Sequence, residues 1–351
     1  MTTRAKGLQG RLVTGLGKAS AFTNLPWVEE QLIENLGIKP FPGTLNLQLQ
    51  HARDQETWQD MQQTASYRIS APSADSCDAL CHPVRLRGSI TAVALFPLVE
   101  GYSPDLLELV SAVPLRETLD IVDNDLLEVE PVHPIDASCV IFDLDGTLLD
   151  TIEAFYVLAQ RSGDEYGIVM DRSKVHHLLN HGKPYWETVL PDSTEDRAQV
   201  IEQLNQRARA LWPEIMAEYA QVFDGVASTL HALKQAGFTL GIVTGSGQSS
   251  LELLYQAGVE GLFDAVVTGD EVKKRKPHPE GLELCLKKLG LTADKAVYVG
   301  DTSIDMQASR NAGMRGIAVL SGAGSSADLC TAGAQRIIPN HQKLAELVIK
   351  S

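Results

Sequence analysis

The sequence predicts a multidomain protein, in which a small β-barrel is followed by an α/β domain built on a parallel sheet. The chain has 351 residues, which is more than one ordinary hydrophobic core accommodates. Residues 1–130 contain short β-rich pieces separated by Gly and Pro, a pattern typical of small barrels. From residue 139 onward, apolar strands alternate with helices, which indicates a parallel sheet covered on both faces.

The first region shows the turn residues and short apolar runs of a barrel. Its expected strands lie in GRLVTGLG, GTLNLQL, CHPVRLRGSITAVALFP and DLLEVEPV. One helix is predicted in WVEEQLIENLG, where Trp27, Val28, Leu32 and Ile33 share a face and Gly37 is a plausible C-cap. Residues 131–138 contain two prolines and no periodicity, so we interpret them as a linker between domains at 1–130 and 139–351.

The second region repeats the order strand then helix. The expected strands are CVIFDLD, GFTLGIVTGS, FDAVVTGD, KAVYVGD and RGIAVLSG, with helices such as PEGLELCLKKLG between them. Residues 153–222 depart from this alternation, because they are helical and amphipathic throughout. We interpret them as a helical insertion after the first strand.

Composition and charge narrow the class of protein. A net charge of −15 argues against nucleic acid and anionic membrane surfaces as partners. We find no apolar run of membrane-spanning length and no signal-peptide pattern at the start, so we expect a cytoplasmic protein. The five cysteines form no paired framework; a metal site near Cys77, Cys81 and His82 is conceivable, but reduced thiols are favoured.

Polar residues follow the expected strands at the point where each strand ends. Asp143, Thr244, Asp270 and Asp301 all fall at such carboxyl ends, where ligands bind in open α/β sheets. Clustered carboxylates raise one another's pKa, and a divalent cation such as Mg²⁺ offsets that repulsion. The loop KKRKPHP could add a lysine. A carboxylate nucleophile, a metal and a cation suit phosphoryl transfer from a phosphomonoester.

Four ordered motifs carry a family resemblance. DLDGTLLD, VTGS, KPHP and GDTSIDMQASRNAG resemble the motifs of the haloacid dehalogenase superfamily, and most closely its phosphoglycolate-phosphatase-like branch. The resemblance implies a Rossmann-like α/β core with an inserted α-helical cap at about 153–222, and a magnesium-dependent phosphatase. It implies that Asp143 is the nucleophile, Asp145 the general acid and base, and Lys276 the lysine that neutralises charge.

The same resemblance assigns the binding residues. Thr244 matches the phosphate-binding hydroxyl, supported by the backbone amides of Gly245 and Ser246. Lys183 lies where that family places a specificity loop, so it either contacts the leaving group of a small phosphorylated metabolite or belongs to a simple surface loop.

The metal ligands also follow from the resemblance. They are Asp143, Asp301 and the main-chain carbonyl of Asp145. Asp305 matches the second acid of the last motif, which positions either the lysine or the metal shell.

A separate signal lies in LGIKPFPGTLNLQL. Gly43 permits close backbone contact, while Thr44 and Asn46 alternate along a strand and therefore share a face, where they could hold a metal–phosphate group. A tight hairpin entry, in which both residues only cap the turn, is the alternative.

This stretch, with GLG, CHPVRLRG and PDLLELVSAVPLRETLDIVDNDLLEVE, resembles the archaeal-type CTP-dependent riboflavin kinase, a cradle-loop barrel. The resemblance places Gly15 and Gly17 in the nucleotide loop and assigns magnesium and phosphate to Thr44 and Asn46. It makes Glu108 a candidate base and implies CTP as donor, with riboflavin and FMN as substrate and product.

Two departures from the kinase pattern keep the function of the barrel open. Lys18 and Ala19 replace an acidic residue and a glycine, and Gly101 and Tyr102 stand where a histidine is common. The two resemblances together lead us to expect a bifunctional kinase and phosphatase. The alternatives are a phosphatase regulated by a non-catalytic nucleotide- or flavin-binding barrel, and a phosphomutase in the second region.

Overall fold

The computed structural model describes residues 7–15, 22–65, 67–73, 76–133 and 135–349. The chain folds into two compact units. The first comprises Met1–Pro134 with Ser325–Pro339, and the second comprises Ile135–Gly324 with Asn340–Ser351. Among the described helices, none is both long enough and apolar enough to cross a bilayer.

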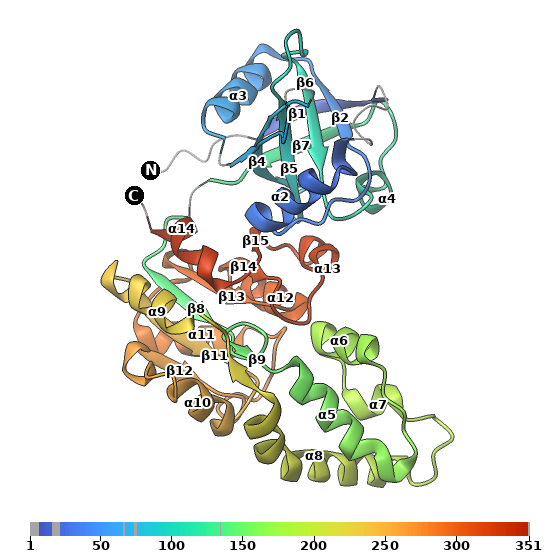
Figure 1. Ribbon diagram of the computed structural model, residues 1–351, viewed down its shortest axis with the longest axis vertical. Helices are drawn as coiled ribbons and strands as arrows, with labels where there is room; N and C mark the ends of the chain where they lie inside the picture. Colours follow the sequence, from blue (N-terminus) through green and yellow to red (C-terminus); the bar gives the residue numbers. More distant parts are fainter. Residues whose placement is uncertain (1–6, 16–21, 66, 74–75, 134, 350–351) are drawn as a thin grey trace. The chain divides into compact units, whose positions relative to one another are not determined.

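The first unit contains an antiparallel barrel (Figure 1). The sheet order is β3-β4-β5-β6-β2-β1-β7, and an additional β4–β7 pairing closes six strands into a barrel, with β3 attached to β4. The strands are β1 (Leu8–Val13), β2 (Leu45–Leu49), β3 (Tyr67–Ile69), β4 (Ala79–Leu86), β5 (Ile90–Pro97), β6 (Leu106–Val110) and β7 (Leu126–Pro131). Closure leaves fewer unpaired strand edges, which suits strands this short.

Three helices accompany the barrel: α2 (Pro26–Leu36), α3 (Ala52–Gln63) and α4 (Leu115–Leu119). The predicted helix corresponds to α2, and Gly37 closes it in the left-handed conformation at φ 62°. Sequence reasoning did not find α3, which is strongly polar. Its buried apolar residues are Trp58 and Met61, and Trp58 stacks on Phe96 with ring centroids 3.7 Å apart.

The second unit is built on a largely parallel sheet. Its strand order is β12-β11-β8-β13-β14. The bounds are β8 (Cys139–Phe142), β11 (Thr239–Val243), β12 (Ala265–Val267), β13 (Ala296–Gly300) and β14 (Arg315–Val319). These five lie in the five predicted strands. The strand β15 (Arg336–Ile338) falls in the part of the chain assigned to the first unit and was not predicted. Central strand β8 pairs in parallel with β11 and β13, so Ile141 lies opposite both Gly241 and Tyr298.

Helices connect these strands. α11 packs against β11 and β12, and α12 packs against β13 and β14. The remaining bounds are α9 (Val226–Gln235), α10 (Gln248–Tyr255), α11 (Glu280–Leu289), α12 (Ser303–Asn311) and α14 (Leu344–Val348), with short 3₁₀ turns η1 (Asp164–Tyr166), η2 (Glu260–Leu262), η3 (Ala293–Lys295) and η4 (His341–Lys343). The helix α13 (Ser326–Thr331) falls in the part of the chain assigned to the first unit.

A helical insertion, defined here as residues 152–219, interrupts the second unit after its first strand (Figure 1). It comprises α5 (Ile152–Gly163), α6 (Arg172–His181), α7 (Tyr185–Val189) and α8 (Arg197–Tyr219). The short strands β9 (Leu149–Asp150) and β10 (Gln221–Val222) pair antiparallel at its base. α5 packs along α8, which closes the insertion into a helical layer of its own.

Candidate active site

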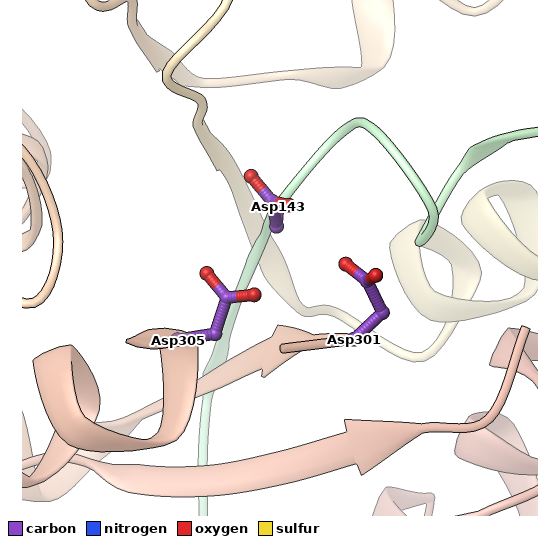
Figure 2. A group of neighbouring side chains, drawn as sticks. All are labelled: Asp143, Asp301 and Asp305. Atoms are coloured by element: carbon purple, nitrogen blue, oxygen red, sulfur yellow. The ribbon is translucent and has the colours of Figure 1, made fainter. Parts of the chain in front are cut away.

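Two neighbouring strands deliver the acidic residues at their carboxyl ends. β8 ends at Phe142 and β13 ends at Gly300, so Asp143 and Asp301 directly follow two paired central strands. Asp305 joins them from the first turn of α12. Figure 2 shows the three carboxylates grouped around one space, and an oxygen of each lies within 4.8 Å of the others. Of the residues expected at the strand ends, Asp143 and Asp301 lie together, whereas Asp270 is exposed and does not belong to this group.

Lys276 lies at the centre of this cluster. Its ammonium donates to Asp143 Oδ1 at 2.7 Å and to Asp305 Oδ1 at 2.6 Å. A third bond goes to the hydroxyl of Tyr298 at 3.0 Å. A lysine has three donors, so this set satisfies it completely. The position of the cation is thus fixed by groups from three separate segments of the chain.

Asp305 serves two neighbours at once. Its Oδ2 accepts from the backbone N–H of Thr302 at 3.0 Å, while the Thr302 hydroxyl caps the backbone of Asp305, which forms a capping box at the start of α12. Its Oδ1 accepts from Lys276 and lies 3.1 Å from the Tyr298 hydroxyl. Because both carboxylate oxygens are engaged, the geometry favours Asp305 as the residue that holds the lysine, the first of the two roles expected for it.

Burial sets the electrostatics of the cluster. Asp143 is 6% exposed and Asp301 is 1% exposed. Burial raises the pKa of Asp143 well above its usual range, opposed by Lys276 and reinforced by the charges of Asp305 and Asp301. Burial and the charge of Asp305 raise the pKa of Asp301 to about 7. Burial alone would lower the pKa of Lys276, but Asp143 and Asp305 outweigh it and raise that pKa.

Two glycines let the backbone approach Asp301. A Cβ on Gly146 would lie 2.4 Å from Asp301 Oδ2, and a Cβ on Gly322 would lie 1.9 Å from the same oxygen. Gly146 also has φ 77°, which a side chain rarely tolerates. The backbone N–H of Ala323 donates to Asp301 Oδ2 at 2.8 Å. The second carboxylate is therefore held in place by tightly packed main chain.

Asp145 faces the loop that follows β11. Its Oδ2 accepts a hydrogen bond from the Ser246 hydroxyl. Burial raises the pKa of Asp145, although the bond from Ser246 opposes the shift. Thr244 is buried, and its hydroxyl accepts the backbone N–H of Ser246 at 3.0 Å. Gly245 and Ser246 line the cavity that opens over these residues. Thr244 is not among the lining residues and holds the loop through its bond from Ser246.

A cavity of about 700 Å³ opens over these residues within the second unit. Its floor includes Asp143, Asp145, Lys276 and Asp301, and its other walls come from the helical insertion, Lys183 among them. Asn180 at the end of α6 accepts the backbone N–H of Ser303 at 2.7 Å, which fastens that helix to the start of α12. Lys183 follows soon after this anchor.

Sequence reasoning missed two contributors. Tyr298 is fully buried in β13 and contacts both Lys276 and Asp305. Within the sequence KAVYVGD, nothing distinguishes it from an ordinary residue of a buried strand. Glu280 accepts the backbone N–H groups of Lys273 and Lys274 at 2.9 and 3.0 Å. These two bonds make Glu280 a residue that orders the basic loop.

The residues present fit a hard divalent cation. Buried carboxylates whose pKa values are raised by burial and by each other are stabilised when a cation neutralises them, and oxygen-only ligands suit Mg²⁺. Within the described ranges, Asp143, Asp301 and Asp305 are the one group of three or more His, Cys, Asp or Glu residues whose ligand atoms all lie within 4.8 Å of one another. The five cysteines, all of which lie in the described residues, form no disulfide.

The barrel brings together most of its predicted residues. Asn46 lies opposite Glu108 in the β2–β6 register, so both side chains project from the same face. Gly15 packs against Asn46, since a Cβ there would lie 2.2 Å from the amide nitrogen. The buried Thr44 hydroxyl has no hydrogen-bond partner in the described chain, and Gly17 lies outside the described residues.

One further contact involves the predicted base. The Tyr102 hydroxyl donates to Glu108 Oε1 at 2.7 Å. Burial and the neighbouring Glu108 charge raise the pKa of Tyr102. The carboxylate of the candidate base Glu108 therefore already accepts a hydrogen bond from Tyr102, a residue that the kinase pattern does not place there.

The sheet, the insertion and the buried carboxylate–lysine cluster together define a hydrolase core of the α/β class. The model of the haloacid dehalogenase-like hydrolases matches residues 140–319, slightly more than half of the chain. The chain belongs to the haloacid dehalogenase-like hydrolase family, which confirms the predicted phosphatase type. A second model, named for CTP-dependent riboflavin kinase and described as the domain of unknown function DUF120, matches residues 12–130 and confirms the resemblance of the barrel.

Named relatives match the second region. Pyrophosphatase PpaX of Bacillus velezensis is 34% identical over 180 residues, covering 51% of this chain and 81% of the relative. Phosphoglycolate phosphatase of Xanthomonas campestris pv. campestris is 34% identical over 193 residues, covering 52% of this chain and 83% of the relative. A solved hydrolase from Pseudomonas syringae is similar in fold, with a TM-score of 0.52 and 23% identity over 60% of this chain and 99% of that one.

Proposed function

We propose that the second unit is a magnesium-dependent phosphatase that removes phosphate from a small phosphorylated metabolite through an aspartyl-phosphate at Asp143. The observation that supports this most is the single buried cluster in which Lys276 bonds Asp143 and Asp305 while Asp301 lies beside them. Asp143, Asp301 and the main-chain carbonyl of Asp145 would hold Mg²⁺. When bound, the ion would neutralise charge on the phosphoryl oxygens.

Each residue of the cluster has a separate part in the chemistry. A carboxylate oxygen of Asp143 forms a bond to phosphorus while the bond to the leaving-group oxygen breaks. Asp145, whose pKa is raised by burial, donates a proton to that oxygen and then takes one from the water that hydrolyses the acyl phosphate. Lys276 keeps its charge beside the nucleophile, and Gly245 and Ser246 line the cavity where phosphate would bind.

The test is phosphate release from p-nitrophenyl phosphate by the wild type and by Asp143→Asn. Loss of the nucleophile should abolish turnover, a fall of about 10⁴-fold or more, without changing the melting temperature by more than a few degrees. EDTA should abolish phosphate release by the wild type, and added magnesium should restore it. Retained turnover in Asp143→Asn would remove the nucleophile assignment.

We propose that the barrel binds CTP and a flavin and acts as a riboflavin kinase. Gly15, Gly17, Thr44 and Asn46 would hold the nucleotide, its metal and its phosphates, and Glu108 would be the base. The convergence of Gly15, Asn46 and Glu108 supports this proposal. The hydrogen bond from Tyr102 to Glu108 favours the second candidate, a barrel that binds nucleotide or flavin without catalysis and regulates the phosphatase.

Incubation with riboflavin and either CTP or ATP separates the two candidates. Formation of FMN and CDP supports the kinase and excludes the binding-only barrel. Heat of binding without product supports the binding module. The absence of both heat and product contradicts both candidates.

The cytoplasmic location expected from the sequence stays a prediction.

A further inference from the structure

The helical insertion turns an aromatic wall toward the acidic cluster. Phe155 of α5, Tyr185 of α7 and Trp212 of α8 line the same cavity as Asp143 and Lys276. The rings of Phe155 and Trp212 lie with centroids 4.8 Å apart and planes inclined by 35°, so the two rings contact each other within this wall. Aromatic faces of this kind stack on planar rings.

The α8 part of this wall also carries hydrogen-bond donors. Asn205, Ala208, Arg209 and Trp212 occupy positions i, i+3, i+4 and i+7, so they share one face of the helix, and all line the cavity. In the described chain, the side chains of Arg209 and Lys183 have neither an ion-pair nor a hydrogen-bond partner. Arginine and lysine only donate, so both would pair with acceptor atoms of a ligand.

The size of the cavity also favours a ligand large enough to cover the aromatic wall. A volume of about 700 Å³ lies in the range of about 300–1,000 Å³ that holds drug-sized ligands. A phosphate with a two-carbon acid, or pyrophosphate, would occupy a small part of it and would leave the aromatic wall facing water. Exposed aromatic surface in a cleft is better explained by a ligand that covers it.

We infer that the substrate of the phosphatase is a phosphomonoester whose leaving group carries a planar heteroaromatic ring with acceptor atoms. The inference rests on the proposed function, because the phosphate must reach Asp143. The ring stacks on Phe155 and Trp212, and its acceptors pair with Arg209 and Lys183. This substrate class differs from what the names of the relatives describe, phosphoglycolate and pyrophosphate.

The test compares kcat/KM for ring-bearing and ring-free substrates of the full-length protein with magnesium. FMN, AMP and pyridoxal 5′-phosphate represent the first class; 2-phosphoglycolate, pyrophosphate and acetyl phosphate represent the second. We expect the best ring-bearing substrate to exceed every ring-free one by about tenfold or more. Trp212→Ala should lower the ratio of kcat/KM for that substrate to that for acetyl phosphate by about 5- to 100-fold.

Two variants keep the result interpretable. Trp212→Phe keeps an aromatic face and should recover most of the ratio. Tyr166→Ala removes an exposed aromatic ring of the same insertion that does not line the cavity, and it should leave the ratio unchanged. A preference for ring-free substrates, or an equal loss on both classes in Trp212→Ala, would overturn the inference. Failure of the wild type to release phosphate from any substrate would instead overturn the phosphatase on which it rests.

Discussion

The two candidate sites differ in how far their polar groups already satisfy one another. In the α/β unit, Lys276 uses all three donors on Asp143, Asp305 and Tyr298. In the barrel, the Thr44 hydroxyl is buried without a partner in the described chain, and the side-chain amide of Asn46 reaches only the Thr44 carbonyl, at 3.5 Å. Buried polar atoms normally have partners, so the lysine cluster of the first site is organised in advance. The barrel site, and Asp145 Oδ1 beside the lysine cluster, have buried groups without a partner in the described chain that a ligand would complete.

The largest expected effect tests the organised site. Lys276→Met removes the cation and leaves Asp143 and Asp305 as close carboxylates, so kcat/KM for phosphate release should fall by about 10²- to 10³-fold. Nucleotide binding by the barrel, measured calorimetrically, should not change. Lys273→Met removes an exposed lysine of the same loop and serves as the control. Equal losses in both variants would mean that loop charge, rather than the cluster, matters.

The next effect tests the incomplete site. Thr44→Val removes the buried hydroxyl, and CTP binding or turnover should weaken by about tenfold, as expected when a hydrogen bond to a charged ligand is lost. Because that hydroxyl lacks a protein partner, the free energy of unfolding should stay constant or rise by up to about 1 kcal/mol. Thr118→Val, whose exposed hydroxyl bonds the Pro114 carbonyl, is the matched control. A large loss of stability in Thr44→Val would show that the hydroxyl serves the fold rather than a ligand.

A smaller effect concerns Tyr298. Tyr298→Phe preserves the packing of β13 but removes one of the three bonds to Lys276, so kcat should fall by about three- to tenfold while KM stays within about twofold. Steady-state kinetics on the best phosphatase substrate measures the split. A rise in KM with an unchanged kcat would contradict a role in positioning the lysine.

The smallest expected effect is a coupling between magnesium and pH. The pKa of Asp301 in the folded, metal-free protein is about 7, above its unfolded value, so the folded state binds the proton more tightly. The contribution of this group to stability is therefore present at low pH and is lost as pH rises through about 7. Magnesium needs the ionised carboxylate, so it should raise the melting temperature by a few degrees at about pH 8 and by less at about pH 6.

Thermal unfolding with millimolar magnesium or with EDTA checks this coupling. Asp301→Asn should lose the pH dependence of the magnesium effect. Equal magnesium shifts at both pH values in the wild type would show that Asp301 does not titrate with the metal.

The sequence predicted the elements that have strong local signals. The strands ending in the motif residues were found because β-rich apolar runs stop abruptly at Asp143, Thr244 and Asp301. β15 has three residues and too little length for any periodicity, and α3 has a polar surface that hides Trp58. Short or polar elements form because tertiary contacts stabilise them, and those contacts cannot be seen in a local pattern.

The residues of the candidate site fall into the same two groups, those with a local sequence signal and those that depend on tertiary contacts. Asp143, Asp145, Lys276 and Asp301 belong to spaced motifs, and such motifs are visible in the sequence alone. Tyr298 could not be found, because its role depends on parallel register that places β13 beside β8. The wall of Phe155 and Trp212 depends on two helices packing together, and each residue alone looks like ordinary helix packing.

The paired strands β9 and β10 have a consequence for how this enzyme can diversify. The helical insertion leaves and re-enters the α/β unit at one antiparallel pair of two-residue strands. Its length and lining can therefore change over generations without shifting the register of the sheet that aims Asp143 and Asp301. On the proposed function, selectivity belongs to the insertion and chemistry to the sheet, so the two lie on separable stretches of chain.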